Sequence, residues 1–139
     1  MSKILALDYG LKRIGLAISD ELHVFAFGLD TISNSMIMTA LKKILIEEKV
    51  DTIIIGKPKK QNNEPSLIEN EILMFVEKLK KKFPKISIKR YDERFTSIIA
   101  KKTIIRSGIN KTKRRNKSLV DKVSATLILQ SYLHKNKIK

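Results

Sequence analysis

The chain has 139 residues, no cysteine and two histidines, and its formal net charge at pH 7 is +15. This length predicts one domain over 1–139, and no apolar run is long enough to span a membrane, so we expect a cytoplasmic protein. Without cysteine, disulfides, thiolate zinc sites and thiol nucleophiles are excluded, and any metal should be a hard ion held by carboxylates. The positive charge favours nucleic acid as partner. An A/T-rich genome, which encodes many lysines, is an alternative source of the charge.

The first third of the chain predicts three antiparallel strands joined by short turns. The expected strands are 3–9, 13–20 and 23–32. Asn34 is a candidate N-cap for a helix that runs to about residue 49, because apolar residues follow at helical spacing. A short, fully apolar strand at 52–56 comes next and is typical of a parallel position.

Strands and helices alternate in the remaining part. Ser66 and Glu69 form a capping-box pattern that predicts a helix to about residue 83. The further expected elements are a strand at 86–91, a helix at 96–107, a basic loop at 109–117 and a last helix at 118–134. This order indicates one mixed five-stranded sheet covered by helices, an α/β fold.

Three acids stand at positions where such a sheet collects ligands. Asp8 closes the first strand, Glu93 follows the fifth, and Asp121 opens the last helix. The carboxyl ends of parallel strands form a ligand crevice in open α/β sheets, so the three carboxylates are expected to meet there. Carboxylates that hold two Mg²⁺ ions are a known means of hydrolysing phosphodiesters.

Each acid also has a purely structural interpretation. Asp8 can begin an Asx turn, and Glu93 can pair locally with Arg94. Asp121 fits a capping box with Ser118, and spacing alone favours that interpretation.

Four segments resemble, in order, the motifs of the YqgF family, also called RuvX, of Holliday-junction-resolvase-like proteins. The opening motif, Asp-x-Gly-x-Lys-x-Ile-Gly, occupies 8–15, and the Asp-Glu-Arg motif begins at Asp92. The other two segments are 55–58 and 121–132. Lys57 departs from the family pattern, which has an apolar residue there, and loop 59–65 matches only in part, so no role is assigned to loop 57–65.

The resemblance implies a ribonuclease-H-like fold and a nuclease that depends on Mg²⁺ or Mn²⁺. Asp8, Glu93 and Asp121 would be both its catalytic residues and its metal ligands. The implied function is hydrolysis of precursor 16S rRNA during 5′-end processing, in ribosome biogenesis. The alternatives are a Holliday-junction resolvase acting on branched DNA and a non-catalytic RNA-binding assembly factor. An actin-like ATPase, which begins in a similar way, needs a much longer chain.

Basic residues near these acids are the candidates for phosphate contacts. The candidates are Lys12, Arg94, Lys111, Lys113, Arg114, Arg115 and Lys117. Aromatic residues for base stacking are missing near this basic loop, so we expect binding to the backbone without reading of sequence. A solvated surface turn is the alternative. The expected assembly is a monomer or weak homodimer, since no sequence feature guarantees a stable dimer.

Overall fold

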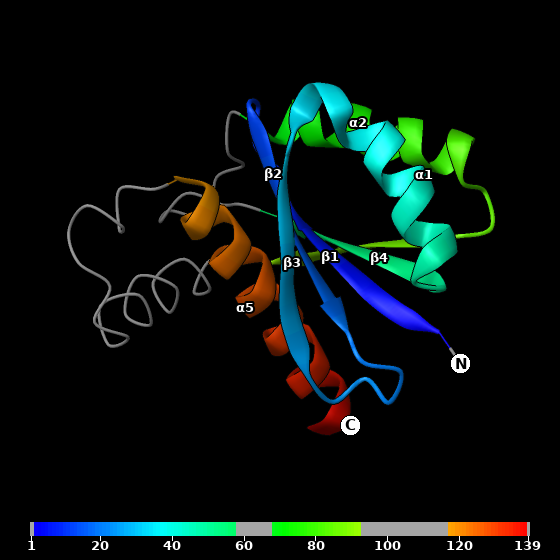
Figure 1. The fold of residues 1–139 in the computed structure, drawn as a ribbon, viewed down its shortest axis with the longest axis vertical. Coiled ribbons are helices and arrows are strands. Elements are labelled where there is room, and N and C mark those ends of the chain that lie inside the picture. The colour runs from blue at the N-terminus through cyan, green and yellow to red at the C-terminus, as the bar shows by residue number, and fades with distance from the viewer. Residues whose placement is uncertain (1, 58–67, 93–116, 139) are drawn as a thin grey trace.

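The computed structural model describes residues 2–57, 68–92 and 117–138, and in the last helix the side chains of 122–135. Five strands form one mixed sheet in the order β3-β2-β1-β4-β5. β1 pairs antiparallel with β2 and parallel with β4, β2 and β3 are antiparallel, and β4 and β5 are parallel (Figure 1). The elements are β1 Lys3–Asp8, β2 Arg13–Ser19, β3 Ala26–Ser33, the 3₁₀ turn η1 Asn34–Met36, α1 Ile37–Glu47, β4 Val50–Lys57, α2 Glu69–Lys82, β5 Ser87–Asp92 and α5 Lys117–Ile138. The mixed five-stranded sheet predicted from the sequence is confirmed.

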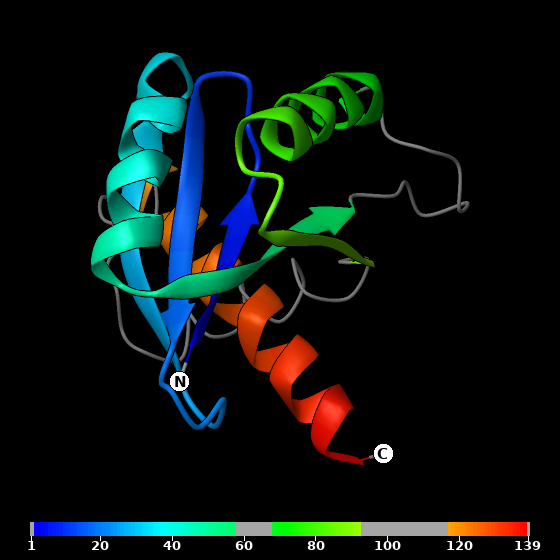
Figure 2. The same ribbon diagram turned by 90° about the vertical axis from the view of Figure 1, so that its right-hand side faces the viewer.

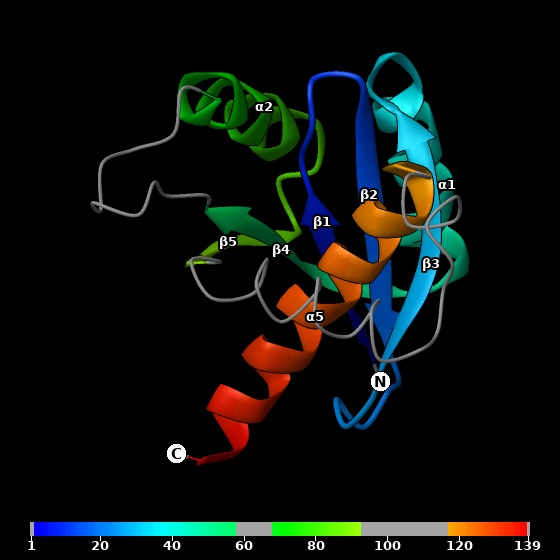
Figure 3. The ribbon, with the colours of Figure 1, turned by 90° about the vertical axis from the view of Figure 1, so that its left-hand side faces the viewer.

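Helices cover both faces of the sheet (Figures 2 and 3). On one face Leu5 and Leu7 of β1 pack in a core that α1 and α2 complete with Leu41 and Phe75. On the other face Ile4 and Ala6 of β1 belong to a second core, to which α5 contributes Ala125, Ile128, Leu129 and Leu133. Each fully buried leucine or isoleucine contributes about 1.5–3 kcal/mol, so the two cores hold β1 firmly in place.

The third strand begins later than the sequence pattern predicts. β3 starts at Ala26, not at residue 23, because a tight turn precedes it. His23 has φ 58°, and the Asp20 carboxylate accepts the backbone N–H groups of Val24 and Phe25, both at 2.8 Å. These bonds hold the chain out of the sheet until Ala26.

Two predicted helix starts differ from the structure. Asn34 does not cap an α-helix but opens η1, and its Nδ2 donates to the Gly10 carbonyl at 2.7 Å. Glu69 lies in the first turn of α2 without a capping bond from its N-cap residue, Ile68. Both side chains are used for longer-range contacts instead. The predicted capping partner Ser66 and the predicted helix 96–107 lie outside the described residues.

Within the described residues, no helix is both long and apolar enough to cross a membrane.

Candidate active site

Asp8 lies at the carboxyl end of β1, half-buried, opposite Gly15 of β2. Successive side chains of a strand point to opposite faces. Leu7 packs on the face covered by α1 and α2, and Ala6 packs on the face covered by α5. The Asp8 side chain therefore belongs to the α5 face.

The carboxyl ends of the three parallel strands lie together. Leu7 is in register with Ile55 of β4, and the last residue of β4, Lys57, is in register with Asp92 of β5. Asp8, Lys57 and Asp92 thus mark one end of the sheet. Ligands bind at this end in open α/β sheets, and it is the end at which the sequence predicts the site.

α5 crosses the sheet from its β3 edge toward β5 (Figure 3). Near the start of the helix, Lys122 packs over Gly28 of β3, where an added Cβ would lie 2.9 Å from the lysine chain. Toward its end, Ser131 bonds the Tyr91 hydroxyl, and the Tyr132 ring meets that of Tyr91 edge-on at 5.9 Å. The first turns of α5 therefore lie over the β2–β3 pair.

An ion pair fastens α2 to the carboxyl end of β4. Arg90 of β5 donates from Nη2 to Glu69 Oε1 at 2.7 Å and to the Gly56 carbonyl at 3.1 Å, and from Nε to the Ile55 carbonyl at 3.3 Å. Glu69 is only 7% exposed, and its Oε2 has no hydrogen-bond partner among the described residues. The pair braces the strand end beside Asp8 from the α2 side.

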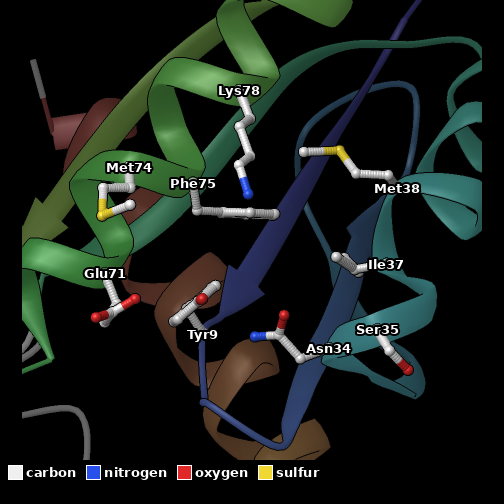
Figure 4. A pocket seen from close by; sticks show the side chains of 9 residues that line it. All are labelled: Tyr9, Asn34, Ser35, Ile37, Met38, Glu71, Met74, Phe75 and Lys78. Carbon is white, nitrogen blue, oxygen red and sulfur yellow. The ribbon is translucent and has the colours of Figure 1, made fainter.

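A pocket of about 250 Å³ opens on the α1 and α2 side of the sheet, beside the residue that follows Asp8 (Figure 4). Tyr9 and Phe75 form an aromatic wall, with ring centroids 5.0 Å apart. The residues that line this pocket, called the Tyr9 pocket below, are Tyr9, Asn34, Ser35, Ile37, Met38, Glu71, Met74, Phe75 and Lys78.

The turn between β1 and β2 carries the predicted phosphate contact Lys12. Its side chain is exposed, and its backbone carbonyl accepts the Asn34 N–H at 2.9 Å. Gly10 in the same turn has no room for a side chain, since an added Cβ would lie 2.5 Å from the Arg13 carbonyl oxygen. The turn that presents Lys12 thus has a fixed shape.

The other predicted site residues are described in part or not at all. Asp121 and Lys117 lie in the first turns of α5, where the backbone but not these side chains is described. The remaining predicted residues, all outside the described residues, are Glu93, Arg94, Lys111, Lys113, Arg114 and Arg115.

Among the side chains that the structure does describe, no three His, Asp or Glu residues come together as a metal site. Of the three predicted ligands, only Asp8 is in that set. A half-buried carboxylate at a strand end suits Mg²⁺ or Mn²⁺, which prefer oxygen ligands.

Comparison with known proteins identifies the family. RuvX, described as Holliday junction resolvase, matches residues 2–135. A protein of Flavobacterium psychrophilum named "Putative pre-16S rRNA nuclease" is 49% identical over 133 residues, which cover 96% of this chain and 97% of the relative. The chain belongs to the RuvX family. Another relative of the same name, from Bacteroides thetaiotaomicron, is 47% identical over 96% of both chains.

Solved structures support the fold of this RuvX chain. RuvC of Thermus thermophilus in complex with a Holliday junction superposes with a TM-score of 0.61 at 13% identity, covering all of this chain and 98% of that one. A second structure of Thermus thermophilus RuvC gives a TM-score of 0.58 at 11% identity, over 97% and 96% of the two chains. The ribonuclease-H-like fold expected from the motifs is confirmed.

Sequence reasoning missed two features of this RuvX chain. The Glu69–Arg90 pair joins residues 21 positions apart. The visible signal in the sequence, Glu69 three residues after Ser66, favoured a local cap. The Tyr9 pocket is assembled from η1, α1, α2 and the β1–β2 turn. No spacing within one element could have revealed it.

Proposed function

We propose that this chain is a divalent-metal-dependent endonuclease that cleaves precursor 16S rRNA during maturation of its 5′ end. The observation that carries the proposal is the position of Asp8, which ends β1 on the α5 face at the carboxyl end of the sheet. We take the proposed substrate, precursor 16S rRNA, from the names of the relatives. The basic sequence suits a polyanion.

Glu93 is the second carboxylate of the proposed site. Along β5, Arg90 bonds Glu69 on the α2 side, whereas Tyr91 packs against α5. Side chains two positions apart in a strand point to the same face, so we expect Glu93 on the face of Tyr91 and Asp92 on the face of Arg90. This alternation favours Glu93 over Asp92 as the partner of Asp8.

Asp121 is the third carboxylate of the proposed site. It precedes Ala125 by four residues, and positions four apart share one face of a helix. Ala125 is fully buried against β1 and β2, in the core that contains Ala6 and Ala17. This spacing favours a role for Asp121 toward the sheet instead of the capping role that spacing with Ser118 suggested.

Together the three carboxylates would hold one or two Mg²⁺ or Mn²⁺ ions, which supply a nucleophile at neutral pH and stabilise charge on the phosphate oxygens. The rest of the protein positions these carboxylates and the substrate strand. The two cores fix β1, and the Glu69–Arg90 pair fixes the end of β4. Lys12, Arg94 and the residues of the basic loop would neutralise neighbouring phosphates, which orients the strand without reading its sequence.

A Holliday junction is the second candidate substrate, because the family is described as a resolvase and the fold is that of RuvC. Resolution requires two symmetric cuts and hence a two-fold dimer. The monomer or weak homodimer that we expect favours RNA.

The test is a cleavage assay with labelled leader RNA and a four-way DNA junction side by side, with Mg²⁺, Mn²⁺ or chelator. We expect metal-dependent cleavage of the RNA. Symmetric nicks in the junction by a tight dimer, with intact RNA, would instead establish a resolvase. RNA binding without cleavage of either substrate in any metal would establish a non-catalytic assembly factor.

A further inference from the structure

We propose that the Tyr9 pocket binds one unpaired nucleobase of the substrate strand, next to the phosphate at the Asp8 site. This inference rests on the proposed function and deepens it. It adds a subsite that recognises a base to a protein whose other candidate contacts are with the phosphate backbone.

The position of the pocket links it to the proposed site. Asp8 and Tyr9 are consecutive, so their Cα atoms are about 3.8 Å apart. Asp8 belongs to the α5 face, whereas Tyr9 packs with the core on the α1 and α2 side. A strand that passes over the end of β1 can therefore present a phosphate to one side and a neighbouring base to the other.

The size of the pocket suits a single base. Its volume of about 250 Å³ is below the roughly 300–1,000 Å³ of sites for drug-sized ligands. One planar heterocycle fits such a space better than a dinucleotide does.

The walls provide the contacts that a planar base needs. The rings of Tyr9 and Phe75 form one side, and Met38 lies on the other, with Met74 at the edge (Figure 4). Bases stack on aromatic rings, and thioethers adapt to flat aromatic surfaces. Phe75 is 5% exposed and is held by the core, so it fixes the ring of the half-buried Tyr9, which is the more accessible part of this wall.

The polar groups at the pocket point to a base rich in N–H donors. Asn34 uses Nδ2 to bond the Gly10 carbonyl, which directs its amide oxygen toward the space beside Ile37 (Figure 4). The Glu71 carboxylate lies at the edge near Tyr9 and supplies further acceptors. Guanine offers adjacent imino and amino donors, so we expect guanine to bind most tightly.

The methionines give a direct readout that involves no cleavage. Four methionines occur in the chain, of which Met38 and Met74 line the pocket. Met36 is 53% exposed and does not line it, so it serves as an internal control. The experiment is a titration of the full chain, labelled with ¹³C in its methionine methyl groups, with each nucleoside 5′-monophosphate and with ribose 5-phosphate.

We expect guanosine monophosphate to shift the Met38 and Met74 signals with a dissociation constant on the order of 1 mM, while Met36 stays unmoved. Ribose 5-phosphate should leave all signals in place. Glu71→Gln should weaken guanosine monophosphate binding about tenfold, the effect of losing one charge-assisted hydrogen bond. Glu77→Gln, an exposed site on the same helix, should not. Met74→Trp should fill the pocket and abolish the shift of Met38.

The inference is overturned if no nucleotide shifts the pocket methionines, or if ribose 5-phosphate shifts them equally. Unchanged binding in Met74→Trp would also overturn it. An inactive protein that still binds guanosine monophosphate here would refute the nuclease proposal alone, because the titration does not depend on cleavage.

Discussion

Arg90 of β5 and Glu69 of α2 form an ion pair of 2.7 Å next to the backbone carbonyls at the end of β4. Through these bonds Arg90 joins two strands and a helix at the end of the sheet where Asp8 lies. The Arg90 guanidinium therefore contributes to the stability of this end.

Replacing Arg90 by alanine should lower the free energy of unfolding by about 3–5 kcal/mol, because it leaves the Glu69 carboxylate buried without its cation. The double variant Arg90→Met, Glu69→Leu should recover most of that loss. Urea denaturation measures both, with the exposed Lys81→Ala as control. A loss in Arg90→Ala as small as that of the control would show that the pair contributes little.

Gly10 and Gly28, which both have close neighbours, should respond differently to alanine. Gly10→Ala should cost about 1–3 kcal/mol, because the new Cβ meets a backbone oxygen that cannot move freely. Gly28→Ala should cost less, since the neighbours there are the side chains of Lys122 and Thr126, which can shift. Equal losses of unfolding free energy in the two variants would contradict the fixed shape of the β1–β2 turn.

The turn before β3 should make stability depend on pH. Backbone N–H groups of Phe25 and Val24 hold the pKa of Asp20 below its ordinary value. A carboxyl group with a lowered pKa in the folded state stabilises the fold above its unfolded pKa, and the effect is lost as the pH falls through the folded value. Asp20→Ala should thus be less stable than the parent at pH 7, and the difference should shrink below about pH 4. Urea midpoints measured across this pH range provide the check, and a constant difference would argue against the charged hydrogen bonds.

The basic loop should bind nucleic acid through its charge. Replacing Lys113, Arg114 and Arg115 by alanine should reduce the slope of log affinity against log salt by about 2–3, since each lost phosphate contact removes roughly 0.7–0.9. Filter binding of leader RNA at several salt concentrations measures the slope. An unchanged slope would identify the loop as an ordinary solvated turn.

Local patterns were sufficient to predict the sheet. Runs such as Ile53 to Ile55 are fully buried in the structure, and burial of a strand on both faces is what a continuous apolar run indicates. The face of Asp8 follows from the same alternation.

Contacts between distant residues were not predictable from the sequence. Asn34 and Glu69 both have side chains that are common at helix starts, and both bond partners far along the chain instead. Propensity describes only the local choices of a residue, whereas tertiary contacts decide between them. The predicted start of β3 was wrong for a related reason. The turn before β3 depends on which backbone groups the Asp20 carboxylate reaches.

The central claim is that Asp8 belongs to a metal-dependent nuclease site, and Asp8→Asn tests it most directly. The measurement is the rate of cleavage of labelled pre-16S leader RNA in Mg²⁺ or Mn²⁺, for the parent and Asp8→Asn, with unfolding in urea as a check on the fold. We expect cleavage by the parent, which chelator abolishes, and a variant that folds as the parent does but has lost cleavage. Cleavage by Asp8→Asn at the parental rate would contradict the account.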